Sequence, residues 1–145
     1  PNKKYPVMIY FYEKNANTLY RHRNPTPSRS TVNIPYFVSN GYVVFVPDVY
    51  FTDGHPGQSA MKSIMPGVEM LEKTYPWIDG ENMAIQGQSW GGYQVAYMIT
   101  QTNKFTESLN LPRDEVYPVG LVVCPWFERE DILAQGVYLW NKVGL

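Results

Sequence analysis

The stretch of sequence that decides the fold is Gly87-Gln88-Ser89-Trp90-Gly91, which is followed by a second glycine, Gly92. The segment before it, residues 82–86, is short and apolar and predicts a β-strand. The segment after it, residues 93–103, has apolar residues at helical spacing and predicts an α-helix. A serine flanked by glycines therefore stands on a tight turn that joins a strand to a helix.

A Gly-x-Ser-x-Gly turn between a strand and a helix is typical of the nucleophile elbow of α/β-hydrolases. Such a turn is strained and exposes the serine hydroxyl, and glycines without a Cβ let the strand and the helix approach closely. The N-terminus of the helix directs backbone N–H groups toward negative charge that forms beside the serine. Ser89 is therefore the candidate nucleophile, and the backbone N–H of Trp90 is a candidate donor to an oxyanion.

Composition and charge exclude several classes of protein. The chain has 145 residues, of which 44% are hydrophobic and 15% aromatic, so it predicts one folded domain rather than a disordered segment. The net charge of −1 favours neither nucleic acid nor an anionic membrane as a partner, and no apolar run is long enough to span a membrane. A single cysteine excludes an internal disulfide. Neither a metal site nor another cofactor is expected, because no cluster of ligating residues has metal-site spacing. Nothing in the sequence indicates a compartment.

Predicted strands and helices alternate along the chain. The predicted strands are residues 7–12, 42–46, 82–86 and 119–123. The predicted helices are residues 34–39, 59–74, 93–103 and 130–140. Pro66 lies inside the second helix, where it predicts a kink or a restart. The alternation favours an α/β fold with a mostly parallel sheet and helices on both faces, which with the elbow is a partial α/β-hydrolase fold.

Three segments resemble the catalytic domain of the prolyl oligopeptidase family, which includes dipeptidyl peptidases and acylaminoacyl peptidases. They are Lys4-Tyr5-Pro6-Val7 with the strand that ends at Tyr12, Gly41-Tyr42-Val43-Val44 with Pro47-Asp48, and the stretch from Gly87 to Tyr93. The resemblance covers roughly residues 3–105. It implies a serine peptidase that cleaves peptide substrates by acyl transfer.

The resemblance assigns roles to three residues of the site. Ser89 matches the nucleophile, and the N–H of Trp90 matches one oxyanion donor. Tyr12 stands where the family has a tyrosine whose hydroxyl is the second oxyanion donor. A tyrosine that only packs at the edge of the sheet is the alternative interpretation of Tyr12.

The acid and the base of a catalytic triad are not found in the sequence. A serine nucleophile needs a histidine base oriented by a carboxylate, and in α/β-hydrolases both follow the serine in the chain. The histidines here are His22 and His55, and both precede Ser89. His55 lies in a loop that opens on the same edge of the sheet as the elbow, but it is more simply part of an exposed turn. We therefore expect that residues 1–145 are the N-terminal part of a catalytic domain and are inactive, or nearly so, alone.

Residues 106–145 depart from the family pattern. A polar insert precedes the strand at 119–123, and Cys124-Pro125-Trp126 follows it, where the family has a strand of small residues. The sequence leaves open whether this strand is equivalent to that of the family. The carboxylates after the elbow lie in no family motif and are interpreted as surface charges; they are Glu107, Asp114, Glu115, Glu128, Glu130 and Asp131.

Two alternative functions stay open at this point. One is an esterase or acyl hydrolase of the same fold, and the other is a non-catalytic α/β module that binds another protein. A truncated sheet has an unpaired edge strand, so we expect self-association through that edge in either case. An open Ser89 hydroxyl beside the Trp90 N–H would favour a peptidase, whereas a buried one would favour the module.

Overall fold

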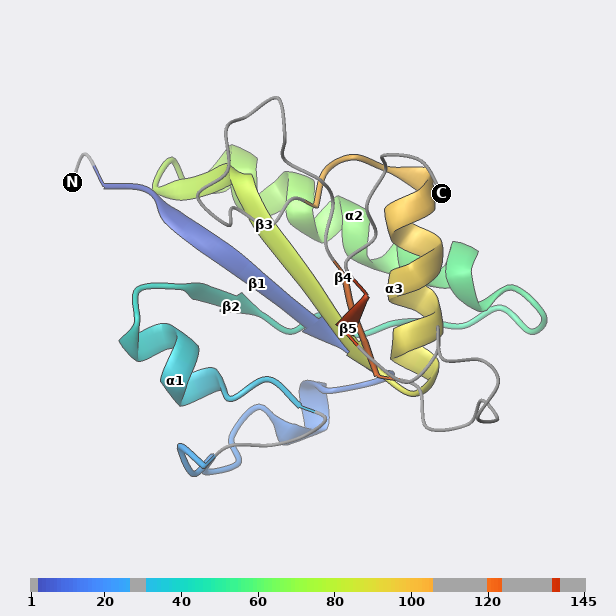
Figure 1. Cartoon of the computed structure of the whole chain (residues 1–145), viewed down its shortest axis with the longest axis horizontal. Helices are drawn as coiled ribbons and strands as arrows, with labels where there is room; N and C mark the ends of the chain where they lie inside the picture. The colour runs from blue at the N-terminus through green and yellow to red at the C-terminus, as the bar shows by residue number, and fades with distance from the viewer. Residues whose placement is uncertain (1–2, 27–30, 106–119, 124–136, 139–145) are drawn as a thin grey trace.

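The structure, a computed structural model, describes residues 3–26, 31–105, 120–123 and 137–138 of the chain (Figure 1). Strands and helices alternate, as the sequence predicts. In chain order the elements are β1 (Tyr5–Phe11), the short 3-10 helix η1 (Ala16–Thr18), α1 (Ile34–Ser39), β2 (Val43–Phe45), α2 (Pro56–Thr74), β3 (Ile78–Gln88), α3 (Trp90–Gln101), β4 (Gly120–Val123) and β5 (Val137–Tyr138).

The strands form a single sheet in the order β2-β1-β3-β4-β5. β1 is parallel to β2 on one side and to β3 on the other, with Ile9 opposite Phe45 and Ile85. β4 continues the parallel arrangement beside β3, and β5 is antiparallel to β4. The prediction of a partial α/β-hydrolase fold with a mostly parallel sheet is therefore confirmed.

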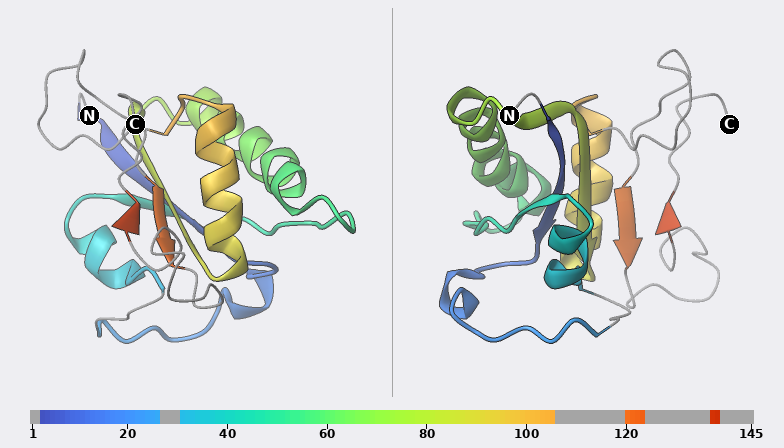
Figure 2. Two further views of the ribbon diagram at one scale, coloured as in Figure 1. Left: turned by 45° about the vertical axis from the view of Figure 1, so that its right-hand side comes forward. Right: turned by 90° about the vertical axis from the view of Figure 1, so that its left-hand side faces the viewer.

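The direction of the connections places helices on both faces of the sheet. In the strand order β2-β1-β3-β4-β5, the connection from β1 to β2 runs toward the β2 edge of the sheet. The connections from β2 to β3 and from β3 to β4 run in the opposite direction, toward β5. Because crossovers between parallel strands are right-handed, α1 covers one face, and α2 and α3 cover the other. α2 and α3 lie side by side on their shared face (Figure 2).

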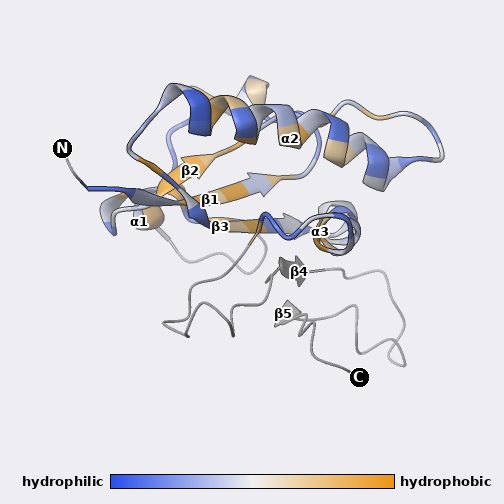
Figure 3. Cartoon of the chain, turned by 90° about the horizontal axis from the view of Figure 1, so that it is seen from above, coloured by the Kyte–Doolittle hydropathy of each residue, from blue (hydrophilic) through white to orange (hydrophobic). Residues whose placement is uncertain are grey.

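The main core lies between the sheet and this pair of helices. In Figure 3 the hydrophobic colour is concentrated on the strands, and α2 turns hydrophilic residues outward. α2 presents buried residues at helical spacing, so one face packs while the other is solvated. The buried members of the core are Val7, Ile9, Phe11, Val49, Ala60, Ile64, Val68, Ile78, Met83, Ile85, Val95, Met98, Ile99 and Phe105.

The predicted bounds of α1 are confirmed, and its ends have clear local causes. The side chain of Asn33 accepts a hydrogen bond of 3.1 Å from the backbone N–H of Tyr36, which caps the first turn. Gly41 has φ +82° just after the helix, a conformation that favours glycine. The chain thus turns directly from α1 into β2.

The predicted bounds of α2 and β3 were wrong at their starts. α2 begins at Pro56 rather than at residue 59, and it continues through Pro66 without a restart. Pro66 is exposed, so water can satisfy the backbone carbonyl that loses its helical partner there. β3 begins at Ile78 and not at residue 82.

The last predicted helix, residues 130–140, was wrong where the structure tests it. Val137–Tyr138 form β5, which pairs with Gly120 and Leu121 of β4. A β-branched and an aromatic residue fit a strand, and pairing with β4 gives their backbone groups partners that periodicity alone cannot anticipate. The rest of this predicted helix and the polar insert at 106–117 lie outside the described residues. The predicted strand at 119–123 is confirmed over 120–123.

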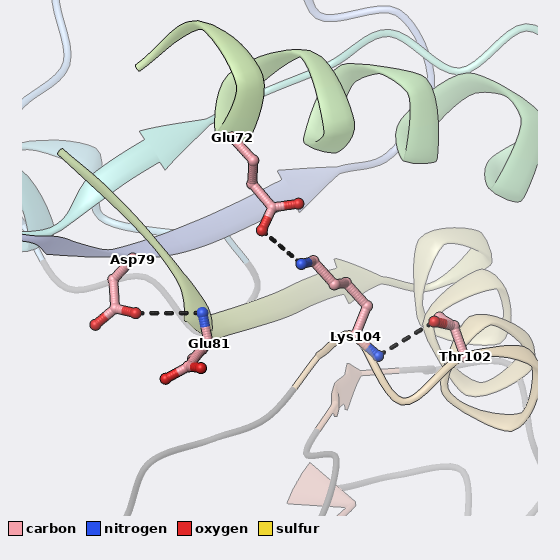
Figure 4. A network of polar contacts seen from close by, with 5 residues as sticks. All are labelled: Glu72, Asp79, Glu81, Thr102 and Lys104. Carbon is pink, nitrogen blue, oxygen red and sulfur yellow. Dashed lines mark hydrogen bonds and ion pairs between the residues drawn. The ribbon is translucent and has the colours of Figure 1, made fainter. Parts of the chain in front are cut away.

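An ion pair and hydrogen bonds stabilise the amino end of β3 and the segment after α3 (Figure 4). Lys104 forms an ion pair of 2.5 Å with Glu72 of α2. The carboxylate of Asp79 accepts hydrogen bonds from the backbone N–H of Glu81, at 3.2 Å, and from the side-chain amide of Asn82, at 2.7 Å. This end of the sheet is opposite to the end where β3 turns into α3. Within the described part of the chain, no helix is both long and apolar enough to cross a membrane.

Candidate active site

The connections of the sheet diverge at the carboxyl ends of β1 and β3. These two strands are neighbours, but the connection that follows β1 goes to one face of the sheet and the connection that follows β3 goes to the other. Open α/β sheets bind ligands at such a point. Phe11 is opposite Gly87, so Tyr12 and Ser89 follow two neighbouring strand ends on the same edge (Figure 1).

Ser89 has the strained backbone that the sequence pattern predicts. Its dihedral angles are φ 53° and ψ −116°, and among the described residues it is the only non-glycine residue with positive φ. Such a conformation costs about 1–3 kcal/mol when the residue has a Cβ. The Ser89 carbonyl accepts hydrogen bonds from the N–H groups of Gly92, at 2.9 Å, and Tyr93, at 3.2 Å. The predicted sharp turn from strand to helix is thus present.

The glycines of the motif bring the elbow into contact with the end of β1. A Cβ on Gly87 would overlap the carbonyl of Gly91. A Cβ on Gly91 would lie 2.9 Å from the carbonyl oxygen of Phe11 and 3.6 Å from the Cα of Tyr12. Glycine is therefore needed at both positions, because the first turn of α3 packs directly on the β1 backbone.

The structure places all three predicted site residues at this edge. Trp90 is the first residue of α3, so its N–H has no partner within the helix. Tyr12 follows the last residue of β1 and is 37% exposed. Ser89 is 7% exposed as a residue, so most of its surface is covered within the turn.

The loop that contains His55 reaches the elbow helix, as the sheet topology predicts. Pro56 begins α2, and its carbonyl accepts a hydrogen bond of 3.2 Å from the side-chain amide of Gln94 in α3. His55 itself is exposed, and its carbonyl accepts hydrogen bonds from the N–H and the hydroxyl of Ser59. His22 lies on an exposed loop and forms a hydrogen bond of 3.3 Å with Asn24. The carboxylates after the elbow lie outside the described residues.

Two polar residues near the site were missed by sequence reasoning. Gln94 is completely buried between α3 and the start of α2, where it donates to Pro56. Asp48 accepts hydrogen bonds from two backbone N–H groups of the segment after β1. The position of Asp48 just after a strand and a proline was a sequence signal for a site residue. Gln94 has no comparable signal, because it is a single glutamine within a helix.

Tyr10 lies on β1 beside Gln86 of β3, and both are buried. Burial raises the pKa of the Tyr10 phenol above its ordinary value. The charge of Arg23 lowers this pKa in part, and Tyr12 adds to the rise. The Tyr10 phenol is therefore neutral at physiological pH. Among the described residues, no three His, Cys, Asp or Glu side chains are grouped so that they could hold a metal ion.

A strained serine turn between a strand and a helix, placed where the sheet connections diverge, defines the catalytic-domain architecture of α/β-hydrolases. The model of the prolyl oligopeptidase family matches residues 27–109, which is more than half of the chain. The chain therefore belongs to the prolyl oligopeptidase family, a family of peptidases. The match includes β2, α2, β3 and α3, and it leaves out β1, which the sequence resemblance had included.

Proposed function

We propose that Ser89 is the nucleophile of a serine peptidase that hydrolyses peptide bonds through an acyl-enzyme. The observation that supports this most is the positive φ of Ser89 at the end of β3, next to the end of β1. Backbone strain in a residue with a Cβ persists where the surrounding structure enforces it, and it clusters at active sites. Membership of a peptidase family supports peptides over simple esters as substrates.

The proposed reaction uses three groups of this chain. The Ser89 hydroxyl oxygen attacks the carbonyl carbon of the peptide, and its proton passes to a base. The carbonyl oxygen becomes an oxyanion, which accepts hydrogen bonds from the N–H of Trp90 and the hydroxyl of Tyr12. The amine leaves with a proton, and water then hydrolyses the acyl-serine. Because no histidine follows Ser89, we propose that the base and its carboxylate come from parts of the parent protein beyond these 145 residues.

Exposed aromatic residues around this edge support a peptide substrate with apolar side chains. Trp90 and Tyr93 stack with their ring centroids 5.9 Å apart, and both are exposed. Tyr50 and Phe51, on the loop after β2, are exposed as well. Aromatic side chains combine a large apolar surface with little conformational entropy to lose, so they suit binding surfaces.

A fluorophosphonate probe tests this proposal directly. We expect the folded chain to be labelled slowly, at one site, with no labelling of Ser89→Ala and unchanged labelling of the exposed control Ser39→Ala. Labelling should be slow because the oxyanion donors act without the base, which in well-studied enzymes leaves about 10³–10⁴-fold catalysis over water. Intact-protein mass spectrometry over time measures the rate. Labelling that survives in Ser89→Ala, or a folded chain that is never labelled, would contradict a nucleophilic Ser89.

A second candidate function is a non-catalytic interaction module, and the burial of Ser89 favours it. In the described sheet β2 has a neighbour on one side only, and residues 42–46 are uncharged, β-favouring and partly or fully exposed to solvent. Such an edge can pair with another strand. We propose that it pairs with the same strand of a second copy of the chain.

Charge on the β2 edge should weaken this self-association. Val44 is the middle residue of β2, and a lysine there opposes edge pairing because its charge would be buried beside the partner strand. We expect sedimentation velocity to show a mass that rises with concentration for the original chain and for Val44→Thr, and a monomer for Val44→Lys. Equal sedimentation of Val44→Thr and Val44→Lys would show that the edge is not the interface.

A further inference from the structure

The segments that follow β1 and β2 are tied together by three hydrogen bonds. One carboxylate oxygen of Asp48 accepts the backbone N–H groups of Asn15, at 2.5 Å, and Ala16, at 3.0 Å. The N–H of Val49 donates to the carbonyl of Glu13 at 2.8 Å. Since these bonds span more than thirty residues of sequence, they fix the position of one loop on the other.

This tie lies directly beside Tyr12. On one side of Tyr12, β1 ends at Phe11 and the first turn of α3 packs against the backbone at Gly91. On the other side, the chain passes through Glu13 into the turn whose N–H groups bond to Asp48. The Tyr12 backbone is therefore held between the elbow and the Asp48 carboxylate.

We propose that Asp48 is a positioning residue that holds Tyr12 in place for oxyanion binding, an inference that rests on the proposed function. A hydroxyl donor lowers a reaction barrier only when it is already aimed at the forming charge. Tyr12 is 37% exposed, so core packing alone does not immobilise its side chain. Hydrogen bonds to a carboxylate are roughly twice as strong as neutral ones, so Asp48 is suited to fix the turn that follows the tyrosine.

Asp79 provides a matched control. Like Asp48, it accepts two N–H hydrogen bonds, but it lies at the amino end of β3 (Figure 4). Ser89 follows the opposite end of the same strand. Loss of either carboxylate should lower stability to a similar extent. A role in general stability would therefore affect fluorophosphonate labelling equally in the two variants, whereas a positioning role would not.

A double-mutant cycle tests whether Asp48 acts through Tyr12. We expect Asp48→Ala to slow labelling of Ser89 about tenfold or more, since loss of one oxyanion donor costs about 10²–10³-fold in known enzymes. Asp48→Asn should stay within a few-fold of the original rate because its amide oxygen still accepts both N–H groups, and Asp79→Ala should leave the rate unchanged. Tyr12→Phe combined with Asp48→Ala should be no slower than Tyr12→Phe alone. If the reductions in labelling rate caused by the two single substitutions multiplied in the double variant, the proposal would be overturned.

A second measurement does not depend on the reactivity of Ser89. Fluorine NMR of 3-fluorotyrosine at position 12 reports whether the ring is held in one environment. Asp48→Ala should shift or broaden this signal, and Asp79→Ala should not. If the chain is never labelled, the proposed function fails, but a Tyr12 signal that responds to Asp48 alone still supports the positioning role. A signal that is unchanged in Asp48→Ala would overturn it.

Discussion

Replacement of Gly87 by alanine should lower the free energy of unfolding by about 3 kcal/mol. The new methyl group would overlap the carbonyl of Gly91, and both groups belong to backbone that is fixed by β3 and by the first turn of α3. No side chain can move aside to relieve the overlap, so the strand and the helix must separate. Urea denaturation followed by circular dichroism measures the loss.

Gly54→Ala is the control for Gly87→Ala. Gly54 has φ +75°, but a Cβ there would meet no atom within 4 Å. Alanine at this position should cost about 1–2 kcal/mol, the ordinary cost of a left-handed backbone in a residue with a Cβ. If Gly87→Ala were no less stable than Gly54→Ala, the close contact between β3 and α3 would be refuted.

Truncation of Phe11 should be comparably damaging. Phe11 is completely buried in the core at the carboxyl end of β1, and Phe→Ala substitutions at such sites cost about 3–5 kcal/mol. Because Tyr12 follows Phe11 and the Phe11 carbonyl lies against the elbow, we also expect slower labelling of Ser89 in any fraction that stays folded.

Tyr20→Ala is the comparison for Phe11→Ala, and thermal unfolding of both variants measures the difference. Tyr20 is 96% exposed, so its loss should change stability by no more than about 0.5 kcal/mol. Similar unfolding temperatures for the two variants would mean that Phe11 does not anchor the core.

Local patterns predicted the elbow better than any other part of the molecule. A Cβ on Gly87 would overlap Gly91, only four residues away, so this steric requirement is visible in a short stretch of sequence. The expected α/β alternation and the bounds of α1 were confirmed for the same reason, since the apolar spacing and the capping residues lie close together in the chain.

The errors occurred where distant or solvent contacts decide the structure. Pro66 does not end α2, because its face is solvated while Ile64 and Val68 hold the opposite face in the core. Val137–Tyr138 are strand because β4 lies beside them, although their spacing fits a helix. The two hydrogen bonds that Asp48 accepts from the loop after β1 join residues more than thirty positions apart, so no local pattern could reveal them.

The unfavourable backbone of Ser89 also bears on how the sequence could drift over generations. At φ 53° glycine is sterically more favourable than serine. A lineage under selection for folding alone would therefore gain stability by replacing this serine with glycine. Substitution would then replace Ser89, while the surrounding glycines, which are required for packing, would be retained. A serine at the least favourable position of the turn therefore supports the proposed role of Ser89 as nucleophile.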